Sequence, residues 1–477
     1  MKQTFHIAEP LYEQLRRHLF PGDQDEHGAV ILAGIAESDR STRFLAREVV
    51  LAEDGVDYVP GKRGYRALTA DFVARISDRC ALENLCHFAA HCHGGDDQVS
   101  FSNMDLASQR RGYPALLDIT NGGPVGALVF AENAAEGNVW RRSGVTALDR
   151  LTVIGPNLRR LFPCSSGLAQ EIDPIYHRQS LLFGERGQLA LSEAKVAVIG
   201  LGGAGSLVSQ WLAHLGVGHI IGVDFDGLEP SNRPRVVGTT PWDAGEPFAK
   251  SRFSIVRRLG ARLAKRKVHV AARVARLANP KVLYEPIVGD VSDMAVARRL
   301  TDADYIFLCA DSMKARLVFN ALSHQYLIPG AQIGSKVPVE KKTGAVKEVF
   351  LVSRRVLPYS GGGCLSCNQL IPPDLLREES LTLRERRAQA YVADNGVAAP
   401  SVITLNALAA AQAINDFLFS FHGLIEPYSQ DGYMMHYPRE RSWIPVSCAS
   451  DRECLHCGSG RISAYALGDR GSLPCKQ

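Results

Sequence analysis

Apolar and polar positions follow two different patterns along the chain, and the change falls near residue 175. Before it, short apolar runs such as 29–36 and 126–132 are mixed with stretches typical of helices. From Lys195 onward, unbroken apolar runs alternate with amphipathic segments. Unbroken runs are typical of strands buried on both faces of a parallel sheet. The pattern predicts an α/β chain with a Rossmann-like, doubly wound and mostly parallel sheet in its C-terminal part.

The predicted strands and helices of the C-terminal part can be assigned to residue ranges. Strands are expected at 195–200, 219–226, 282–290, 305–311 and 332–339. Helices are expected at 206–216, 251–266, 312–327 and 401–419. The polar segment 372–398 is expected to be helical or mobile. Residues 161–175 carry Pro, Ser and Gly and are typical of a linker, which predicts one domain over 1–160 and another over 176–477.

Composition places the chain among globular proteins, with 46% apolar and 22% charged residues. A net charge of +4 over 477 residues argues against an extended nucleic-acid surface. No apolar run approaches the roughly 20 residues that span a bilayer, and no signal peptide opens the chain. We therefore expect a cytoplasmic protein with no membrane partner. In that reducing compartment the 11 cysteines are expected to bind metal or take part in catalysis rather than to form disulfides.

A glycine-rich turn joins the first predicted strand to the first helix in VIGLGGAGS, residues 198–206. Such a turn brings backbone amides close to a phosphate at a helix N-terminus. Its glycines are Gly200, Gly202, Gly203 and Gly205. Asp224 and Asp226 end the next strand, where a carboxylate can accept from a ribose hydroxyl. By itself the turn is equally typical of an NAD or FAD enzyme.

Residues before and after the turn in the sequence favour a triphosphate with magnesium over a nicotinamide dinucleotide. They are polar or charged and flank the predicted strands: Arg178, Ser231, Asn232, Arg235, Lys250 and Asp311.

The same motifs resemble the ThiF/MoeB family of ubiquitin-activating-type adenylyltransferases over about residues 175–460. In order, the motifs are YHRQ, GLGGAGS, DFDGLEPSNRPR, AK and CAD. The resemblance implies that Asp224 holds the ATP ribose and that Asp311 organises Mg²⁺. It implies phosphate contacts for the polar and cationic set Ser231, Asn232, Arg235 and Lys250. Arg178 would reach the site of a partner subunit, which implies a homodimer.

The implied reaction is adenylation of a C-terminal carboxylate, usually of a Gly-Gly tail on a ubiquitin-like protein. A conjugating enzyme or a sulfur carrier would be a further partner. Many members of the family carry a thioester or persulfide on a Cys after the first zinc pair, whereas residues 368–447 contain no Cys. The adenylate would then pass to a thiol on a partner, or to an amine.

Two CxxC pairs, Cys364 with Cys367 and Cys454 with Cys457, make up the ligand set of a structural zinc. A single CxxC would also suit a redox dithiol. The family that the chain resembles carries a similar split zinc site. Cys309 is expected in the core, and Cys448 and Cys475 have no assigned role.

The N-terminal part contains a second candidate metal site. His91 and His93, two apart on a strand, face the same side, and Asp105 provides a third ligand with room for a catalytic water. Glu26 precedes an apolar strand and is a candidate general base on that water.

This set resembles the JAMM (JAB/MPN) zinc isopeptidases over residues 1 to about 150. The resemblance implies a catalytic zinc on His91, His93 and Asp105, with Ser102 stabilising the oxyanion. Gly94 stands where the family usually has Pro, and the interval of 11 residues between His93 and Asp105 is one longer than usual. A degenerate domain that only binds is the alternative.

Together the two parts predict an enzyme that activates a ubiquitin-like tail with ATP and trims or releases the same class of protein. Three alternatives remain open at this stage. They are an adenylyltransferase that forms an amide or phosphoramidate on a small peptide, a nicotinamide-dependent oxidoreductase, and a scaffold without activity.

Overall fold

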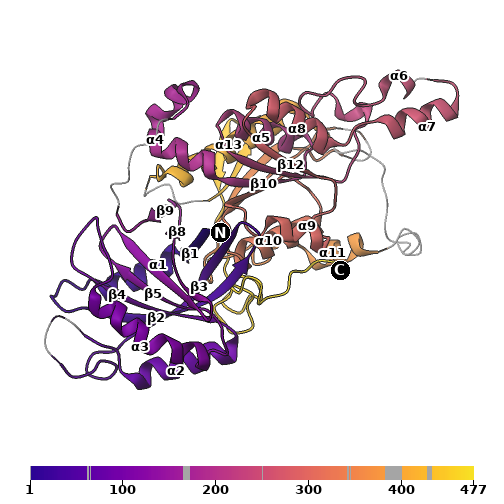
Figure 1. Cartoon of the computed structure of the whole chain (residues 1–477). Coiled ribbons are helices and arrows are strands. Elements are labelled where there is room, and N and C mark those ends of the chain that lie inside the picture. Colours follow the sequence, from indigo (N-terminus) through magenta and orange to yellow (C-terminus); the bar gives the residue numbers. More distant parts are fainter. Residues whose placement is uncertain are drawn as a thin grey trace.

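The structure of the chain is a computed structural model (Figure 1). It describes residues 2–61, 64, 66–164, 172–249, 251–340, 343, 345–381, 400–426 and 432–476. Residues 165–171 of the predicted linker and 382–398 of the polar segment therefore lie outside the described residues.

The first sheet has nine strands in the order β7-β6-β5-β4-β2-β3-β1-β8-β9. Its strands are β1 (Lys2–Ala8), β2 (Gly28–Glu37), β3 (Ser41–Leu51), β4 (Cys86–Cys92), β5 (Val125–Phe130), β6 (Ala135–Arg141), β7 (Gly144–Ala147), β8 (Arg150–Ile154) and β9 (Arg159–Leu161). Its helices are α1 (Glu9–Leu19), α2 (Ala70–Glu83) and α3 (Asn103–Ile119).

Side chains alternate between the two faces of β2, as a strand requires. Ile31 packs in the cluster that contains Leu15 of α1, whereas Val30 and Leu32 pack in the cluster that contains Phe72 of α2. The first sheet is therefore covered on both faces, which explains why β2 is apolar at nearly every position.

The second sheet has eight strands in the order β12-β11-β10-β13-β14-β15-β16-β17. Its strands are β10 (Lys195–Ile199), β11 (His219–Val223), β12 (Leu283–Ile287), β13 (Tyr305–Leu308), β14 (Gly330–Lys336), β15 (Phe350–Val356), β16 (Tyr433–Tyr437) and β17 (Ser442–Pro445). The five predicted strands all form and pair in parallel. An antiparallel extension of β15 to β17 follows, which the periodicity did not predict.

Helices cover both faces of the second sheet, as predicted (Figure 1). Figure 1 shows α5, α8 and α13 on one face and α9 and α10 on the other. The helices of this part are α4 (His177–Glu193), α5 (Gly203–His214), α6 (Glu246–Ala249), α7 (Ser254–Leu263), α8 (Lys267–Ala278), α9 (Met294–Ala297), α10 (Met313–Gln325), α11 (Pro373–Ser380) and α13 (Ile403–His422).

The helix predicted at 251–266 is shorter than expected. It ends at Leu263, and α8 begins at Lys267. Between them the backbone leaves the helix, the Leu228 amide donates to the carbonyl of Lys265 at 2.9 Å, and Gly227 forms a β-bridge with Arg266. This long-range pairing replaces the helical hydrogen bonds, so local periodicity could not predict the break.

The two sheets share apolar packing. Ala36, Leu45 and Ile154 of the first sheet belong to the same buried cluster as Ile199 and Leu308 of the second. The described parts of the two predicted domains are therefore joined by continuous packing as well as by the chain.

A C-terminal segment runs between the sheets (Figure 1). Gly468 forms a bridge with Ile35 of β2, and the Ala466 amide donates to the carbonyl of His324 in α10 at 2.9 Å. A Cβ atom at Gly34 would lie 2.1 Å from the Ala466 carbonyl oxygen. Glycine at position 34 therefore permits this close approach.

Arg43 links the sheets through polar contacts. Its guanidinium donates to the carbonyls of Asp302 and Ala303 at 2.6 Å and to the Asp304 carboxylate at 3.0 Å. The Arg43 side chain is only 7% exposed. Little water therefore reaches this contact to replace the hydrogen bonds that Arg43 donates.

Replacing Arg43 by Met should lower the apparent free energy of unfolding by about 3 kcal/mol or more, because it leaves two carbonyls without their donor and removes the guanidinium paired with the partly buried Asp304 carboxylate. Urea denaturation measures the change. Arg142→Met is the matched control, because Arg142 and its partner Asp118 are 71% and 78% exposed, and it should cost less than about 1 kcal/mol. Equal losses in the two variants would contradict the assigned role of Arg43.

Candidate functional site

The glycine turn follows β10, which pairs with β13. The strand order of the parallel sheet reverses between these two strands, so the turn lies at the switch point of the sheet. Gly200 has a φ of +87°, and a Cβ atom there would lie 2.8 Å from the Ala310 amide nitrogen. A Cβ atom at Gly205 would lie 1.8 Å from the Gly200 carbonyl oxygen. Glycine is therefore needed at both positions. Ligands of doubly wound sheets bind at such a point, next to the helix N-terminus that begins here with Gly202 as N-cap.

Asp224 is held in place by the backbone of this turn. Its carboxylate accepts from the Leu201 amide and from the Asp226 amide, both at 2.8 Å, and it is 8% exposed. Lys267 lies 2.6 Å from the Asp226 carboxylate and 3.8 Å from that of Asp224. The strand-end carboxylates predicted from the sequence therefore lie beside a lysine that the sequence analysis missed.

A cavity of about 830 Å³ opens beside this strand end. Three predicted residues line it, Asp226, Asn232 and Arg235. Four cations that were not predicted also line it: Arg257, Arg262, Arg266 and Lys267. The sequence indicates these cations only by the high density of Arg and Lys in 251–267. That density is equally typical of a solvent-exposed helix face, so only the fold shows that these residues line a cavity.

Unlike Asn232, the predicted residues Ser231, Asp311 and Arg178 do not line the cavity. Asn232 is buried and accepts from the Glu229 amide at 3.1 Å, whereas Ser231 is exposed and donates to the Glu229 carboxylate at 3.3 Å. Asp311 is exposed shortly after β13 and does not line the cavity. Arg178 lies in the first turn of α4, away from α6 and α7 (Figure 1).

The glycines of the turn and Lys250 are also predicted to contact the phosphates. Gly203 lies against α13, where a Cβ atom would meet the Asn406 side chain at 2.1 Å. None of the four glycines lines the cavity itself. Lys250 lies outside the described residues, so its phosphate contact stays a prediction.

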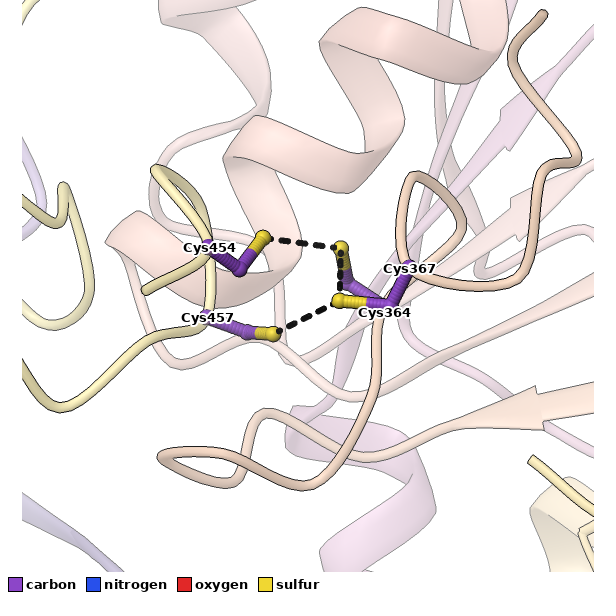
Figure 2. Close-up of side chains that lie close together, drawn as sticks. All are labelled: Cys364, Cys367, Cys454 and Cys457. Atoms are coloured by element: carbon purple, nitrogen blue, oxygen red, sulfur yellow. Dashed lines mark hydrogen bonds between the residues drawn. The ribbon is translucent and has the colours of Figure 1, made fainter. Parts of the chain in front are cut away.

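The four cysteines predicted to bind zinc converge, although 90 residues separate the two pairs (Figure 2). Cys364 Sγ lies 3.7 Å from that of Cys367 and 3.6 Å from that of Cys454, and Cys367 Sγ lies 3.6 Å from that of Cys457. All four sulfurs lie within 4.8 Å of one another. These spacings fit a tetrahedron around an ion about 2.3 Å from each sulfur. The donor set therefore suits a structural zinc.

The other cysteines show no such grouping. Cys309 packs against the core, and its burial raises its pKa. Burial also raises the pKa of Cys475 to about 11, and Cys448 is exposed. None of these observations assigns a nucleophile.

The predicted N-terminal metal ligands also converge. The Nε2 atoms of His91 and His93 lie 3.2 Å apart. The Asp105 carboxylate lies 3.4 Å from the first and 3.3 Å from the second. These distances fit three corners of a tetrahedron around an ion about 2.0 Å from each atom. His93 Nδ1 donates to the Ser100 carbonyl at 3.1 Å, which in a neutral ring leaves Nε2 free to bind a metal.

The pKa values of the two carboxylates at this cluster, Asp105 and Glu26, shift in opposite directions. Burial alone would raise the pKa of Asp105, but hydrogen bonds from His91, His93 and Ser102 hold it well below its usual range. Glu26 lies 3.8 Å from His93, and burial raises the pKa of Glu26. A half-buried carboxylate of raised pKa suits a general base.

Ser102 is the N-cap of α3. Its hydroxyl donates to the Asp105 carboxylate at 2.7 Å and accepts from the Asp105 amide at 3.2 Å. The hydroxyl therefore orients Asp105, a contact that the sequence analysis did not anticipate. Its oxyanion role stays a prediction.

A family model described as "ThiF family" matches residues 176–438, more than half of the chain. The chain belongs to the ThiF family. The match covers both the glycine turn and the parallel sheet, so the Rossmann-like architecture predicted for this part is the fold of a ThiF domain.

Curated relatives of this ThiF chain include three adenylyltransferases. It is 29% identical over 148 residues to molybdopterin-synthase adenylyltransferase of Escherichia coli, covering 31% of this chain and 52% of the relative. It is 32% identical over 200 residues to adenylyltransferase and sulfurtransferase MOCS3 of Mus musculus, covering 42% and 37%. It is 45% identical over 82 residues to sulfur carrier protein adenylyltransferase of Thermus thermophilus, covering 17% and 30%. The chain thus spans about half, or less, of the length of these relatives.

Among solved structures, E. coli MccB with ATP matches at a TM-score of 0.43 and 20% identity, covering 60% of this chain and 75% of MccB.

In the described part of the ThiF chain, no helix combines the length and apolar content that crossing a membrane requires.

Cys457→Ser should reduce the zinc content of the purified chain by one equivalent, because it removes one of four converging thiolates. Elemental analysis by plasma mass spectrometry measures the loss. Cys448→Ser is the control and should retain the parent content, because this exposed cysteine lies outside the cluster. A Cys457→Ser chain with unchanged zinc would show that the cluster binds none.

Proposed function

We propose that the chain uses ATP to adenylate the C-terminal carboxylate of a ubiquitin-like or sulfur-carrier protein. The observation that carries the proposal is a cavity lined by five Arg and Lys side chains just beyond the end of β11. This excess of positive charge suits a triphosphate better than a nicotinamide dinucleotide. The printed names of the three relatives, all adenylyltransferases, support the same reaction.

In this reaction a carboxylate oxygen of the protein substrate attacks the α-phosphorus of ATP, and pyrophosphate leaves. Asp224 accepts from the ribose, and the amides of the turn approach the phosphates. Arg235 and Lys250 offset the charge that develops on the phosphates. Lys267 orients both strand-end carboxylates. Catalysis on this view is positioning and charge neutralisation.

Asp311 is the proposed Mg²⁺ ligand. Its exposed carboxylate follows β13 at the switch point, and Mg²⁺ is commonly bound by one or two carboxylates together with substrate phosphates. The ion would neutralise phosphate charge.

Arg178 is proposed to act in the site of a second copy of the chain. It is exposed near the start of α4, beside the exposed apolar side chains Ile175 and Leu181, which are 75% and 76% exposed. Exposed apolar side chains around a cation are typical of an interface. A homodimer follows from this assignment.

We further propose that the N-terminal cluster hydrolyses a bond at the C-terminus of the same class of protein. His91, His93 and Asp105 would hold a zinc ion, which supplies Lewis acidity for hydrolysis. Glu26 would take a proton from the attacking water, and Ser102 would stabilise the oxyanion while it orients Asp105. The two activities would then act on one tail, first exposing or releasing it and then activating it.

Pyrophosphate exchange into ATP should require the Gly-ended protein substrate, and Arg235→Ala should lower the exchange rate by about 100-fold, because one charge that stabilises the transition state is lost. Asp311→Ala should lower it as well. Arg233→Ala is the matched control from the same loop: Arg233 pairs with Glu246 at 2.7 Å and does not line the cavity. Unchanged exchange in Arg235→Ala and Asp311→Ala, or exchange stimulated only by a small peptide, would reject this substrate.

Cleavage of a C-terminal extension from the same protein should disappear in Glu26→Gln and in His93→Ala, since one loses the base and the other a metal ligand. Glu26→Gln should keep its zinc, whereas His93→Ala should lose one equivalent. Both should retain pyrophosphate exchange. Intact mass measures the trimming. A parent chain that binds the extended protein without trimming it would identify the domain as a binding module.

A further inference from the structure

Three arginines and one carboxylate meet in the contact between the two sheets. Arg43 of β3 lies 3.0 Å from Asp304, and Arg150 of β8 lies 3.9 Å from the same oxygen. Arg160 of β9 lies over the Phe421 ring at 4.1 Å and donates to the Phe421 carbonyl at 3.2 Å. Two guanidinium groups thus share one carboxylate, and a third lines the same cavity.

Arg43 is buried, and Arg150 and Arg160 are partly buried. Burial, followed by repulsion from Arg150, lowers the pKa of Arg160 to about 10. Burial and the nearby arginines also lower the pKa of His6 well below its usual value. Like charges that face one another away from water favour an additional negative charge between them.

A small cavity of about 20 Å³ lies among these groups. Three residues that line it each carry a buried polar atom without a hydrogen-bond partner among the described residues: His6 Nδ1, Arg150 Nε and Thr152 Oγ1. His6 and Thr152 are cross-strand neighbours on β1 and β8, 5% and 4% exposed. Buried polar groups are nearly always hydrogen-bonded, so three around one cavity indicate a ligand.

We propose that this cavity binds one small monatomic anion, chloride, between the two sheets. Its volume is close to that of one water-sized particle. All three atoms can donate, and a water molecule in their midst would leave the charge of the arginines without compensation. A chloride ion accepts from all three and compensates part of the excess charge. Because Asp304 and Phe421 come from the other sheet's domain, the bound ion stabilises the contact between the domains.

The apparent Tm of the full chain tests the proposal. In chloride or bromide it should exceed the value in gluconate of equal ionic strength by about 2 °C or more, and it should keep rising with halide concentration. Thr152→Val preserves shape and removes one donor, so it should reduce the halide response. Arg141→Met is the control: Arg141 donates to Gln3 outside the cavity, and its variant should keep the full response.

Arg150→Met separates anion binding from simple structural support. In gluconate it should be at least as stable as the parent, because a like charge has been removed, and in chloride it should gain nothing. A purely structural arginine would lose stability equally in both salts. Bromide-soaked crystals of the full chain should show anomalous density in the cavity. Equal Tm values in halide and gluconate, or no anomalous peak, would overturn the proposal.

Discussion

Close packing between the two sheets is the contact on which the rest of the molecule depends. Leu45 and Ile154 of the first sheet are buried in the same cluster as Leu308 of the second. Arg43 adds polar contacts there, and the C-terminal segment bridges Ile35 of β2 through Gly468. The predicted nucleotide site and the predicted N-terminal metal site are thus carried by two sheets that pack against each other. Processing and activation of one protein tail on a shared scaffold is consistent with this arrangement.

Charge divides the molecule into regions of different chemistry. The cavity beyond the end of β11 gathers cations from three segments, and the small cavity between the sheets is lined by three more arginines, two of them near Asp304. The N-terminal cluster instead sets two histidines against carboxylates. Each arrangement favours a ligand of opposite charge: a polyphosphate, a small anion and a metal cation. The net charge of +4 conceals these local differences.

The cysteine cluster depends on contacts between segments that are distant in the chain. Cys364 and Cys454 lie 3.6 Å apart across 90 residues, which ties the C-terminal segment to the ThiF domain. From there the chain continues to Ala466, whose amide bonds to α10, and to the edge of β2. The cysteine cluster therefore anchors the segment that also packs against the N-terminal sheet.

The sequence by itself determined the parallel strands, the glycine turn and the convergence of the cysteines, because buried strands, tight turns and thiolate ligands each require residue types that few other contexts tolerate. It did not determine the break after Leu263, the cations of α7 and α8 at the cavity, or the bond from Ser102 to Asp105. Those features depend on partners distant in the chain or on side-chain direction. A basic, amphipathic stretch has the same local pattern whether water or a binding site faces it, so only tertiary packing decided between them.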